Sequence, residues 1–174
     1  MRQVWLISDT HFGHANIIRY ASRPFASVQE MDEAMADRWN ERVKGDDLVY
    51  HLGDVAVGRG GLELFAKLPG TKRLLLGNHD DVGAIMRNAP VQKIELFRGF
   101  REEGFIASHM PLREDDLPPD AVNVHGHIHN KPAPSARHLN LCVEHTDYAP
   151  VPIEEVARRV RERAKAEPSE RPNG

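Results

Sequence analysis

Short polar motifs rich in aspartate, histidine and asparagine recur along this chain, each directly after an apolar segment. They are, in order, Asp9-Thr10-His11, Gly53-Asp54, Gly77-Asn78-His79-Asp80, Ser108-His109 and His125-Gly126-His127-Ile128-His129. The chain holds 10 histidines, and most of them stand beside Asp, Asn or Gly at the ends of apolar segments. Histidines scattered over a surface would not follow this pattern, so the motifs indicate a site assembled from several loops.

The side chains in these motifs offer carboxylate oxygens, an amide oxygen and imidazole nitrogens, but no thiolate. Alternate residues of an extended segment face the same side, so Asp9 and His11 can reach one ion together, as can His127 and His129. This set of donors suits Mn²⁺, Fe, Zn²⁺, Co²⁺ or Ni²⁺ better than Ca²⁺ or an iron–sulfur cluster. The sequence therefore predicts a site for such metals.

Each of these residues also has an ordinary structural interpretation. Asp9 could cap a helix or stand in a turn, and Asp54 after a glycine could belong to a simple turn. Asn78 could be a left-handed turn residue, and a lone histidine such as His109 is more often a hydrogen-bonded structural residue. The metal interpretation is favoured because all the motifs occur together.

The first half of the chain alternates predicted strands and helices. The strands cover residues 3–8, 47–52 and 72–76, and the helices cover residues 27–45, 62–68 and 82–87. The first helix begins with a capping box at Ser27 and Glu30, and Met31, Met35 and Trp39 form its apolar stripe. Repeated strand–loop–helix units imply right-handed crossovers and a largely parallel sheet.

The second half reads as further strands with little helix between them. The segments are residues 94–97, 104–108, 121–125 and 138–143, and a last helix begins at Pro152. Such a chain indicates two sheets packed face to face with helices outside. Loops at the carboxyl ends of the strands of an α/β sheet gather at one edge, and the polar motifs stand at those ends.

Length and composition fit one domain over residues 1–167, followed by a flexible tail over residues 168–174. The net charge is −3, so no global positive field attracts nucleic acid. A single cysteine excludes an internal disulfide and suits a reducing compartment. The N-terminus does not read as a signal peptide, and no apolar run approaches the ~20 residues that span a bilayer. We expect a cytoplasmic protein without membrane contact.

In this order, the motifs D-x-H, G-D, G-N-H-D, a lone H and G-H-x-H resemble those of the calcineurin-like metallophosphoesterases. The resemblance runs from Asp9 to His129, which is most of the chain. The chain is similar to a small bacterial or phage-type member without an added cap domain. The resemblance implies an α/β fold that is a four-layer αββα sandwich, with two mixed sheets flanked by helices.

The resemblance also implies a role for each motif residue. One metal would be held by Asp9, His11 and His129, the other by Asn78, His109 and His127, and Asp54 would bridge both. His79 would contact the phosphate or protonate the leaving oxygen, and Asp80 would orient the His79 ring. The implied cofactor is a pair of divalent metal ions, Mn²⁺ first, with Fe, Zn, Co or Ni as alternatives.

These roles describe a phosphoesterase that acts through a dinuclear-metal-activated hydroxide, with His79 assisting the leaving group. By analogy, phosphodiesters are slightly favoured over monoesters, and the substrate is a small phosphate ester or nucleotide. Two alternatives stay open. A nuclease of the same family would need a basic path to the metals, and a non-catalytic scaffold would keep the fold without the chemistry. The oligomeric state stays open as well.

Other side chains near the motifs have less specific signals. His14 and Arg19 follow the first motif and are candidates for contacts with the substrate. Arg23 could also reach a phosphate, but a solvated loop or a salt bridge is favoured. His51 lies inside a predicted strand and is expected to be packed. Cys142 is not proposed as a nucleophile, because the mechanism needs no covalent intermediate.

Overall fold

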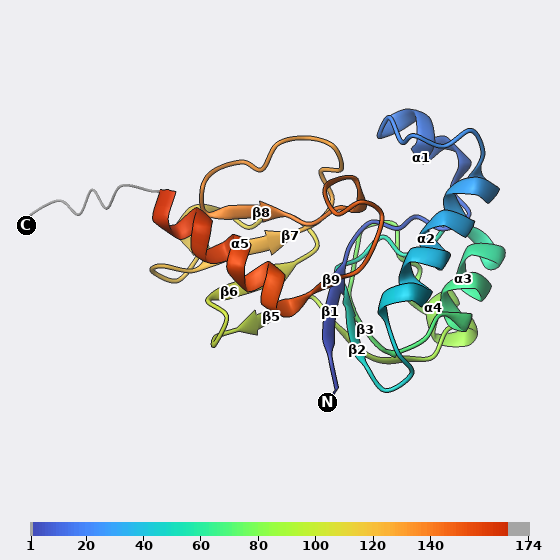
Figure 1. Cartoon of the computed structure of the whole chain (residues 1–174), viewed down its shortest axis with the longest axis horizontal. Coiled ribbons are helices and arrows are strands. Elements are labelled where there is room, and N and C mark those ends of the chain that lie inside the picture. The colour runs from blue at the N-terminus through green and yellow to red at the C-terminus, as the bar shows by residue number, and fades with distance from the viewer. Residues whose placement is uncertain (1, 167–174) are drawn as a thin grey trace, which may run out of the picture.

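The computed structural model describes residues 2–166, and in it two β-sheets pack against each other with helices around them (Figure 1). The flexible tail expected over residues 168–174 lies outside the described residues. None of the helices in the described part of the chain has both the length and the apolar character that a membrane crossing requires.

The first sheet contains the strands predicted in the first half of the chain. Its members are β1 (Val4–Ile7), β2 (Leu48–His51), β3 (Thr71–Leu75), β4 (Val91–Glu95) and β9 (Val151–Pro152), in the order β4-β3-β2-β1-β9. Strands β1 to β4 are parallel and β9 is antiparallel to β1. The predicted parallel core is confirmed, so the carboxyl ends of β1, β2 and β3 meet at one edge.

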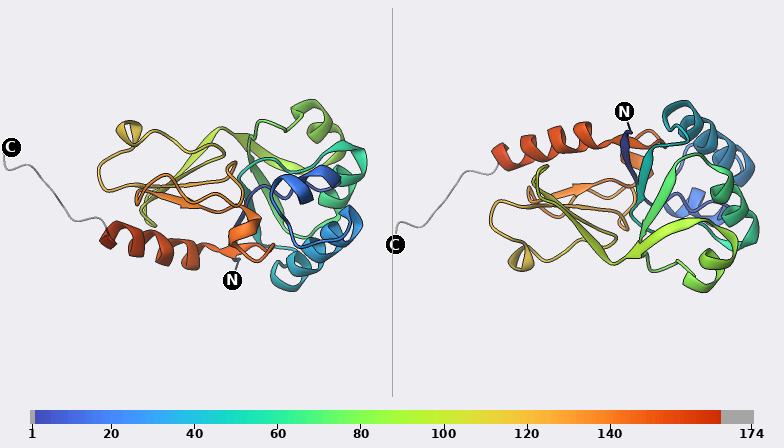
Figure 2. Two further views of the ribbon diagram at one scale, coloured as in Figure 1. Left: turned by 90° about the horizontal axis from the view of Figure 1, so that it is seen from above. Right: turned by 90° about the horizontal axis from the view of Figure 1, so that it is seen from below.

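Helices α1 to α4 cover the outer face of this sheet, as both views of Figure 2 show. They are α1 (Ala15–Tyr20), α2 (Val28–Arg42), α3 (Gly58–Lys67) and α4 (Val82–Asn88). Ser27 caps α2, because its side chain accepts a hydrogen bond from the Glu30 N–H at 3.1 Å. The predicted apolar stripe of α2 is buried. α1 was not predicted, since this short helix buries only Ile17.

The second sheet contains β5 (Phe97–Phe100), β6 (Phe105–Ser108), β7 (Val122–His125) and β8 (His138–Asn140), in that order. β5 is antiparallel to β6, whereas β6, β7 and β8 are parallel. The last helix, α5 (Ile153–Ala166), packs against β1, β7, β8 and β9. Short 3-10 turns stand at Glu114–Asp116 and Val143–His145. The predicted α/β class with two mixed sheets and helices is confirmed.

One strand prediction was wrong. The run over residues 94–97 is not one strand, because β4 ends at Glu95 and β5 begins at Phe97. Leu96 between them is 69% exposed, and here the chain passes from the first sheet to the second. The run over 138–143 was also too long, since β8 ends at Asn140 and Cys142 makes only an isolated bridge.

Two apolar cores hold the layers together. The first lies between the outer face of the first sheet and its helices, and includes Val49, Leu74, Met35, Trp39 and Phe65. The second lies between the sheets and under α5, and includes Leu6, Leu75, Phe105, Val124, Leu139, Val156 and Val160. Side chains along a strand alternate between the two faces of its sheet. The first sheet therefore packs one face against helices α1 to α4 and the other against the second sheet. This packing fixes the strand ends relative to one another.

Candidate metal centre

Five of the predicted metal ligands share an uncommon backbone conformation. Positive φ angles occur at Asp9 (57°), His11 (49°), Asp54 (56°), His127 (70°) and His129 (51°). Left-handed residues other than glycine are infrequent, and they gather where a site needs them. The segments are therefore not extended, so the alternation inferred from the sequence was the wrong reason for pairing Asp9 with His11. The two side chains nevertheless converge.

Backbone hydrogen bonds join the loops that follow β1 and β2. The Asp9 N–H donates to the Gly53 carbonyl at 3.0 Å, and the His11 N–H donates to the Asp54 carbonyl at 3.0 Å. A Cβ on Gly77 would lie 2.2 Å from the Asp54 Oδ1 atom, so only glycine allows the third loop to approach this carboxylate. Loops far apart in sequence are thus fixed in one arrangement.

Asp80 does not hold the ring of His79 as predicted. Its carboxylate accepts hydrogen bonds from the backbone N–H groups of Asp54 at 2.9 Å, Val55 at 2.9 Å and Gly77 at 2.8 Å. A carboxylate can accept several backbone hydrogen bonds at once. The Asp80 carboxylate therefore connects two loops instead of contacting an imidazole. Asp80 therefore positions the Asp54 loop.

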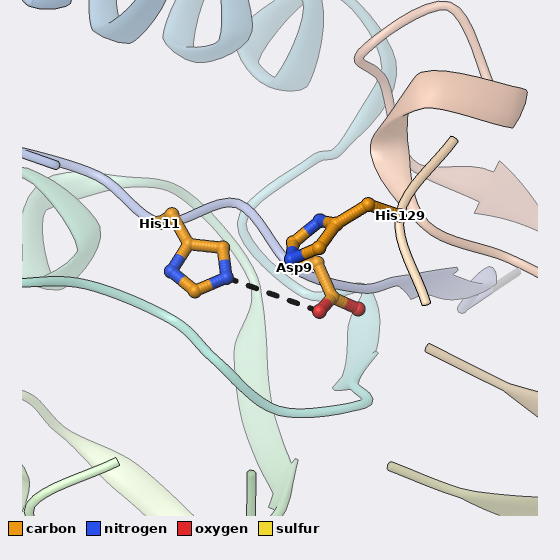
Figure 3. Close-up of side chains that lie close together, drawn as sticks. All are labelled: Asp9, His11 and His129. Atoms are coloured by element: carbon orange, nitrogen blue, oxygen red, sulfur yellow. Dashed lines mark ion pairs between the residues drawn. The ribbon is translucent and has the colours of Figure 1, made fainter. Parts of the chain in front are cut away.

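The first cluster consists of Asp9, His11 and His129. Each offers one potential ligand atom, and these atoms lie within 4.8 Å of one another. Figure 3 shows the rings of His11 and His129 turned toward the Asp9 carboxylate, although they come from loops far apart in the sequence. The His11 Nε2 atom lies 3.9 Å from Asp9 Oδ1. The predicted grouping is thus present.

His11 is the residue whose surroundings point most directly to a cation. It is 1% exposed, and neither of its ring nitrogens has a hydrogen-bond partner in the described part of the chain. Burial, reinforced by the positive charge of Arg23, lowers the pKa of His11 to about 2, so the ring is neutral and has a free lone pair. Buried polar atoms are rarely left without a partner, and a bound metal would supply one.

The second cluster consists of Asn78, His109 and His127. The His109 Nε2 atom lies 2.9 Å from the Asn78 Oδ1 atom, and the other ring nitrogen of His109 contacts the Leu52 carbonyl at 2.9 Å. His109 and His127 offer ligand atoms within 4.8 Å of each other and of Asp54. The predicted second grouping is therefore also present.

Asp54 lies between the two clusters. Its Oδ2 atom is 3.5 Å from the Nε2 atom of His11 and 3.4 Å from the Nε2 atom of His109. Its Oδ1 atom accepts a hydrogen bond from the His79 N–H at 2.9 Å, which fixes the carboxylate. One oxygen of this side chain thus faces a histidine of each cluster.

A buried ion pair between Arg23 and Glu144 supports the first cluster, and Glu144 is the partner that sequence analysis did not identify. Arg23 donates to Glu144 at 2.9 Å and to the backbone carbonyls of Asp9 and Thr10 at 2.6 and 2.9 Å. Glu144 Oε1 in turn lies 3.3 Å from the Nδ1 atom of His129. Burial opposes ionisation of Glu144, but His129 and Arg23 outweigh it and hold the pKa of Glu144 below its usual range. The favoured interpretation of Arg23, a salt bridge, is confirmed.

The two oxygens of Asp9 have different surroundings. The side chains of Ser8 and Cys142 both donate to Oδ2, the thiol at 3.3 Å. The His127 N–H donates to both oxygens, at 2.9 Å to Oδ2 and 3.1 Å to Oδ1. Oδ1 accepts fewer hydrogen bonds than Oδ2, and it is the oxygen that faces His11. Cys142 is buried beside this carboxylate and burial raises the pKa of its thiol, which agrees with a thiol that is not a nucleophile.

The remaining candidate residues stand around the clusters. His79 is exposed, and its ring centroid lies 5.6 Å from that of His11. The His14 ring lies 5.4 Å from that of His11, so it also reaches the clusters. Arg19 is exposed, and its guanidinium carbon lies over the Tyr20 ring, 5.2 Å from the ring centroid. His51 is buried in β2, as expected.

Two mixed sheets have strand-end loops that bring aspartate, histidine and asparagine side chains into two adjoining clusters, an arrangement that fits a binuclear metal centre. The chain belongs to the calcineurin-like phosphoesterase family, whose model matches residues 2–162. Members of this family typically bind divalent metals and are hydrolases. The donor types present here fit such ions.

Several proteins are similar to this chain. An uncharacterized protein of Methanocaldococcus jannaschii, MJ1445, is 34% identical over 165 residues, which cover 88% of this chain and 89% of that protein. The gene 66 protein of Mycobacterium phage D29 is 40% identical over 95 residues, or 52% of this chain and 46% of that protein. The crystal structure of AQ665 from Aquifex aeolicus, titled a protein of unknown function, has a TM-score of 0.73 at 23% identity. It covers 91% of this chain and 99% of that one, which shows a shared fold.

Proposed function

We propose that this protein hydrolyses phosphate esters at a centre of two divalent metal ions, with phosphodiesters slightly preferred over monoesters. Asp9, His11 and His129 would hold one ion, Asn78, His109 and His127 would hold the other, and Asp54 would contact both. The observation that carries the proposal is the position of Asp54 Oδ2, 3.5 Å from His11 and 3.4 Å from His109. A carboxylate shared by two histidine clusters suits a pair of cations.

The chain supplies positioning as well as ligands. Asp80 fixes the Asp54 loop through the backbone N–H groups of Asp54 and Val55, and Arg23 fixes the Asp9 loop through two backbone carbonyls. When bound, the cations would lower the pKa of water and neutralise charge on the phosphate. The exposed His79, whose ring lies 5.6 Å from that of His11, would donate a proton to the leaving oxygen, an effect typically worth about 10²–10⁴-fold. His14, next to His11, would contact the substrate.

The nature of the ion and the location of the protein belong to this proposal. Mn²⁺ is the first candidate, because aspartate, asparagine and histidine together suit it, and Fe, Zn, Co and Ni are the alternatives. The single cysteine fits a reducing compartment, so the proposal places the protein in the cytoplasm. The expected substrate is a small phosphate ester or nucleotide.

Metal removal and restoration test the proposal. Chelation should abolish hydrolysis of bis(p-nitrophenyl) phosphate, and added Mn²⁺ should restore it. Parallel assays with p-nitrophenyl phosphate would measure the preference between diester and monoester. Absence of turnover with every divalent metal tried would contradict the proposal and favour a scaffold with this fold.

His79→Ala separates the chemical role of this residue from metal binding. In the described part of the chain, His79 meets the clusters through its backbone N–H and through the ring of His11, so the variant should keep both metals. Its turnover should fall by about 10²–10⁴-fold, with metal content measured by atomic emission. Loss of metal in proportion to activity would contradict this role.

A further inference from the structure

A hollow of about 390 Å³ lies between α3 and α4, and His79 forms part of its wall. Val57 and Leu62 line it from the side of α3, and Ala84, Ile85 and Asn88 line it from α4. Its volume falls within the range of small-molecule pockets, ~300–1,000 Å³. The hollow therefore has the size of a binding site for a substituent rather than that of a gap between side chains.

His79 connects this hollow to the metal centre. Its ring lies 5.6 Å from the ring of His11, and its backbone N–H donates to Asp54 at 2.9 Å. A phosphate held between the two clusters would thus have His79 at its side, with the hollow directly beyond. A substituent on the phosphate that passes His79 would enter the hollow.

The walls of the hollow select the chemistry of that substituent. Val57, Leu62, Ala84 and Ile85 are apolar, and Leu62 and Ile85 belong to the first core, so this surface is firmly supported. Three polar groups at the rim are engaged within their own helices. Asp81, which caps α4, accepts a hydrogen bond from the Ala84 N–H at 2.9 Å. Arg59 pairs with Glu63 at 2.7 Å. The Asn88 side chain donates to the Ala84 carbonyl at 2.7 Å. The hollow therefore suits a compact, uncharged and mainly apolar group.

A second hollow, of about 680 Å³, lies elsewhere. It is lined by residues of β5 and β6 and by the segment around Pro118, including Phe97 and Ile106. None of the residues of either cluster lines it, nor does His79. Its larger volume does not make it the substrate site, because no predicted metal ligand contributes to its wall.

We infer that the hollow between α3 and α4 receives the leaving group of the substrate, and that this group carries an aromatic or heteroaromatic ring. The inference rests on the proposed function, since it concerns the leaving group of the ester that the enzyme would hydrolyse beside His79. Substrates of this enzyme are then esters of ring-bearing alcohols rather than of small aliphatic ones.

Binding of two phosphonates to the Mn²⁺-loaded protein tests this inference by calorimetry, without any turnover. Phenylphosphonate carries a ring, whereas methylphosphonate reports on the metal centre alone. The wild-type protein should bind phenylphosphonate about tenfold or more tightly than methylphosphonate, because the ring buries apolar surface. Ala84→Phe and Val57→Phe fill the hollow from opposite walls and should bring the two affinities within about twofold.

Met86→Phe is the matched control. It adds the same ring to α4 at a residue that is 64% exposed and does not line the hollow, so the preference for phenylphosphonate should persist. Thermal unfolding checks that each variant folds, and Val57→Phe decides the matter if Ala84→Phe does not fold.

Two results would overturn the inference and leave the proposed function intact. They are equal affinities in the wild-type protein, and a preference that survives in both filled variants. A protein that neither binds methylphosphonate nor hydrolyses bis(p-nitrophenyl) phosphate with Mn²⁺ would instead refute the proposed function, and the inference with it. The two failures are therefore distinguishable.

Discussion

The first cluster and the second cluster of the metal centre are built differently. Asp9 and His11 are buried, and behind them stands the ion pair of Arg23 and Glu144. In the second cluster His109 is buried as well, but Asn78 is exposed, and the Nδ1 atom of His109 contacts the Leu52 carbonyl where His129 has Glu144. The first cluster thus has a buried ion pair behind it, and Asn78 makes the second cluster the more open side of the centre.

This difference has consequences for binding and for catalysis. Partners behind a ligand fix its orientation and raise its affinity for metal, and their loss typically costs about 10–100-fold. We therefore expect the first cluster to bind its ion more tightly than the second. The open second cluster, beside His79, is the side from which a substrate would approach. The comparison predicts an unequal pair of sites.

The largest effect should come from the residue that the two clusters share. Asp54→Ala removes the carboxylate that faces both His11 and His109, so both ions should be lost. Turnover should fall by at least about a thousandfold, because metal chemistry contributes several kcal/mol. Metal content and hydrolysis of bis(p-nitrophenyl) phosphate measure the effect. Retention of one ion at full occupancy would show that the clusters do not depend on a common residue.

The next effect concerns the first cluster. Arg23→Met would leave Glu144 buried without its cation, which should cost about 3–5 kcal/mol in the free energy of unfolding. The variant should also bind its tighter Mn²⁺ ion about 10–100-fold more weakly. Urea unfolding and calorimetry measure the two quantities.

The double variant Arg23→Met/Glu144→Gln is the control for buried charge. It should recover much of the lost stability, because no unpaired carboxylate remains, but it should not recover metal affinity. If the single and double variants were equally unstable, the cost would come from lost packing of Arg23 and not from its charge.

Asn78→Ala examines the second cluster in the same way. Because Asn78 is exposed, its loss should change the free energy of unfolding by less than about 0.5 kcal/mol. The weaker Mn²⁺ ion should nevertheless lose at least about tenfold in affinity, while the tighter ion is unaffected. A stability loss comparable to that of Arg23→Met would remove the distinction between the two clusters.

Lys72 is a buried cation like Arg23, and its substitution is expected to have the smallest effect of the series. It donates to the Leu68 carbonyl and lies over the Phe65 ring at 5.4 Å, and burial lowers its pKa to about 8. Between pH 8 and 10.5, the ordinary pKa of lysine, the unfolded chain binds more protons at this group than the folded one. The free energy of unfolding should therefore rise with pH across this window.

Lys72→Met should remove that rise and should stabilise the protein at pH 7, since a buried charge is replaced by an apolar side chain of similar length. Urea unfolding of both proteins between pH 7 and 10.5 measures it, with the titration of other groups cancelling in the difference. An identical pH dependence in the two proteins would show that Lys72 is not the titrating group.

Much of the fold could be predicted from the sequence because the patterns are local. The strands before the polar motifs and the helix capped by Ser27 follow from periodicity and capping, and they are present. The chain crossing at Leu96 could not be predicted, since an apolar run does not reveal that its two ends belong to different sheets. Sheet membership depends on tertiary packing rather than on local preference.

The site shows the same division. Its members could be predicted because each stands in a polar motif after a strand, but their supports could not. Glu144 is a lone glutamate in a short turn, and only the fold brings it beside His129 and Arg23. The family resemblance assigned Asp80 to the His79 ring, whereas backbone N–H groups of another loop bind it. Contacts between distant loops leave no pattern in the chain.

Anomalous scattering from crystals soaked in Mn²⁺ tests the central claim most directly. Two peaks should appear on either side of Asp54, one among Asp9, His11 and His129 and the other among Asn78, His109 and His127. At limiting Mn²⁺ the peak at the first cluster should be the stronger. Absence of any peak between these side chains, or a single ion bound elsewhere, would contradict a centre of two metals.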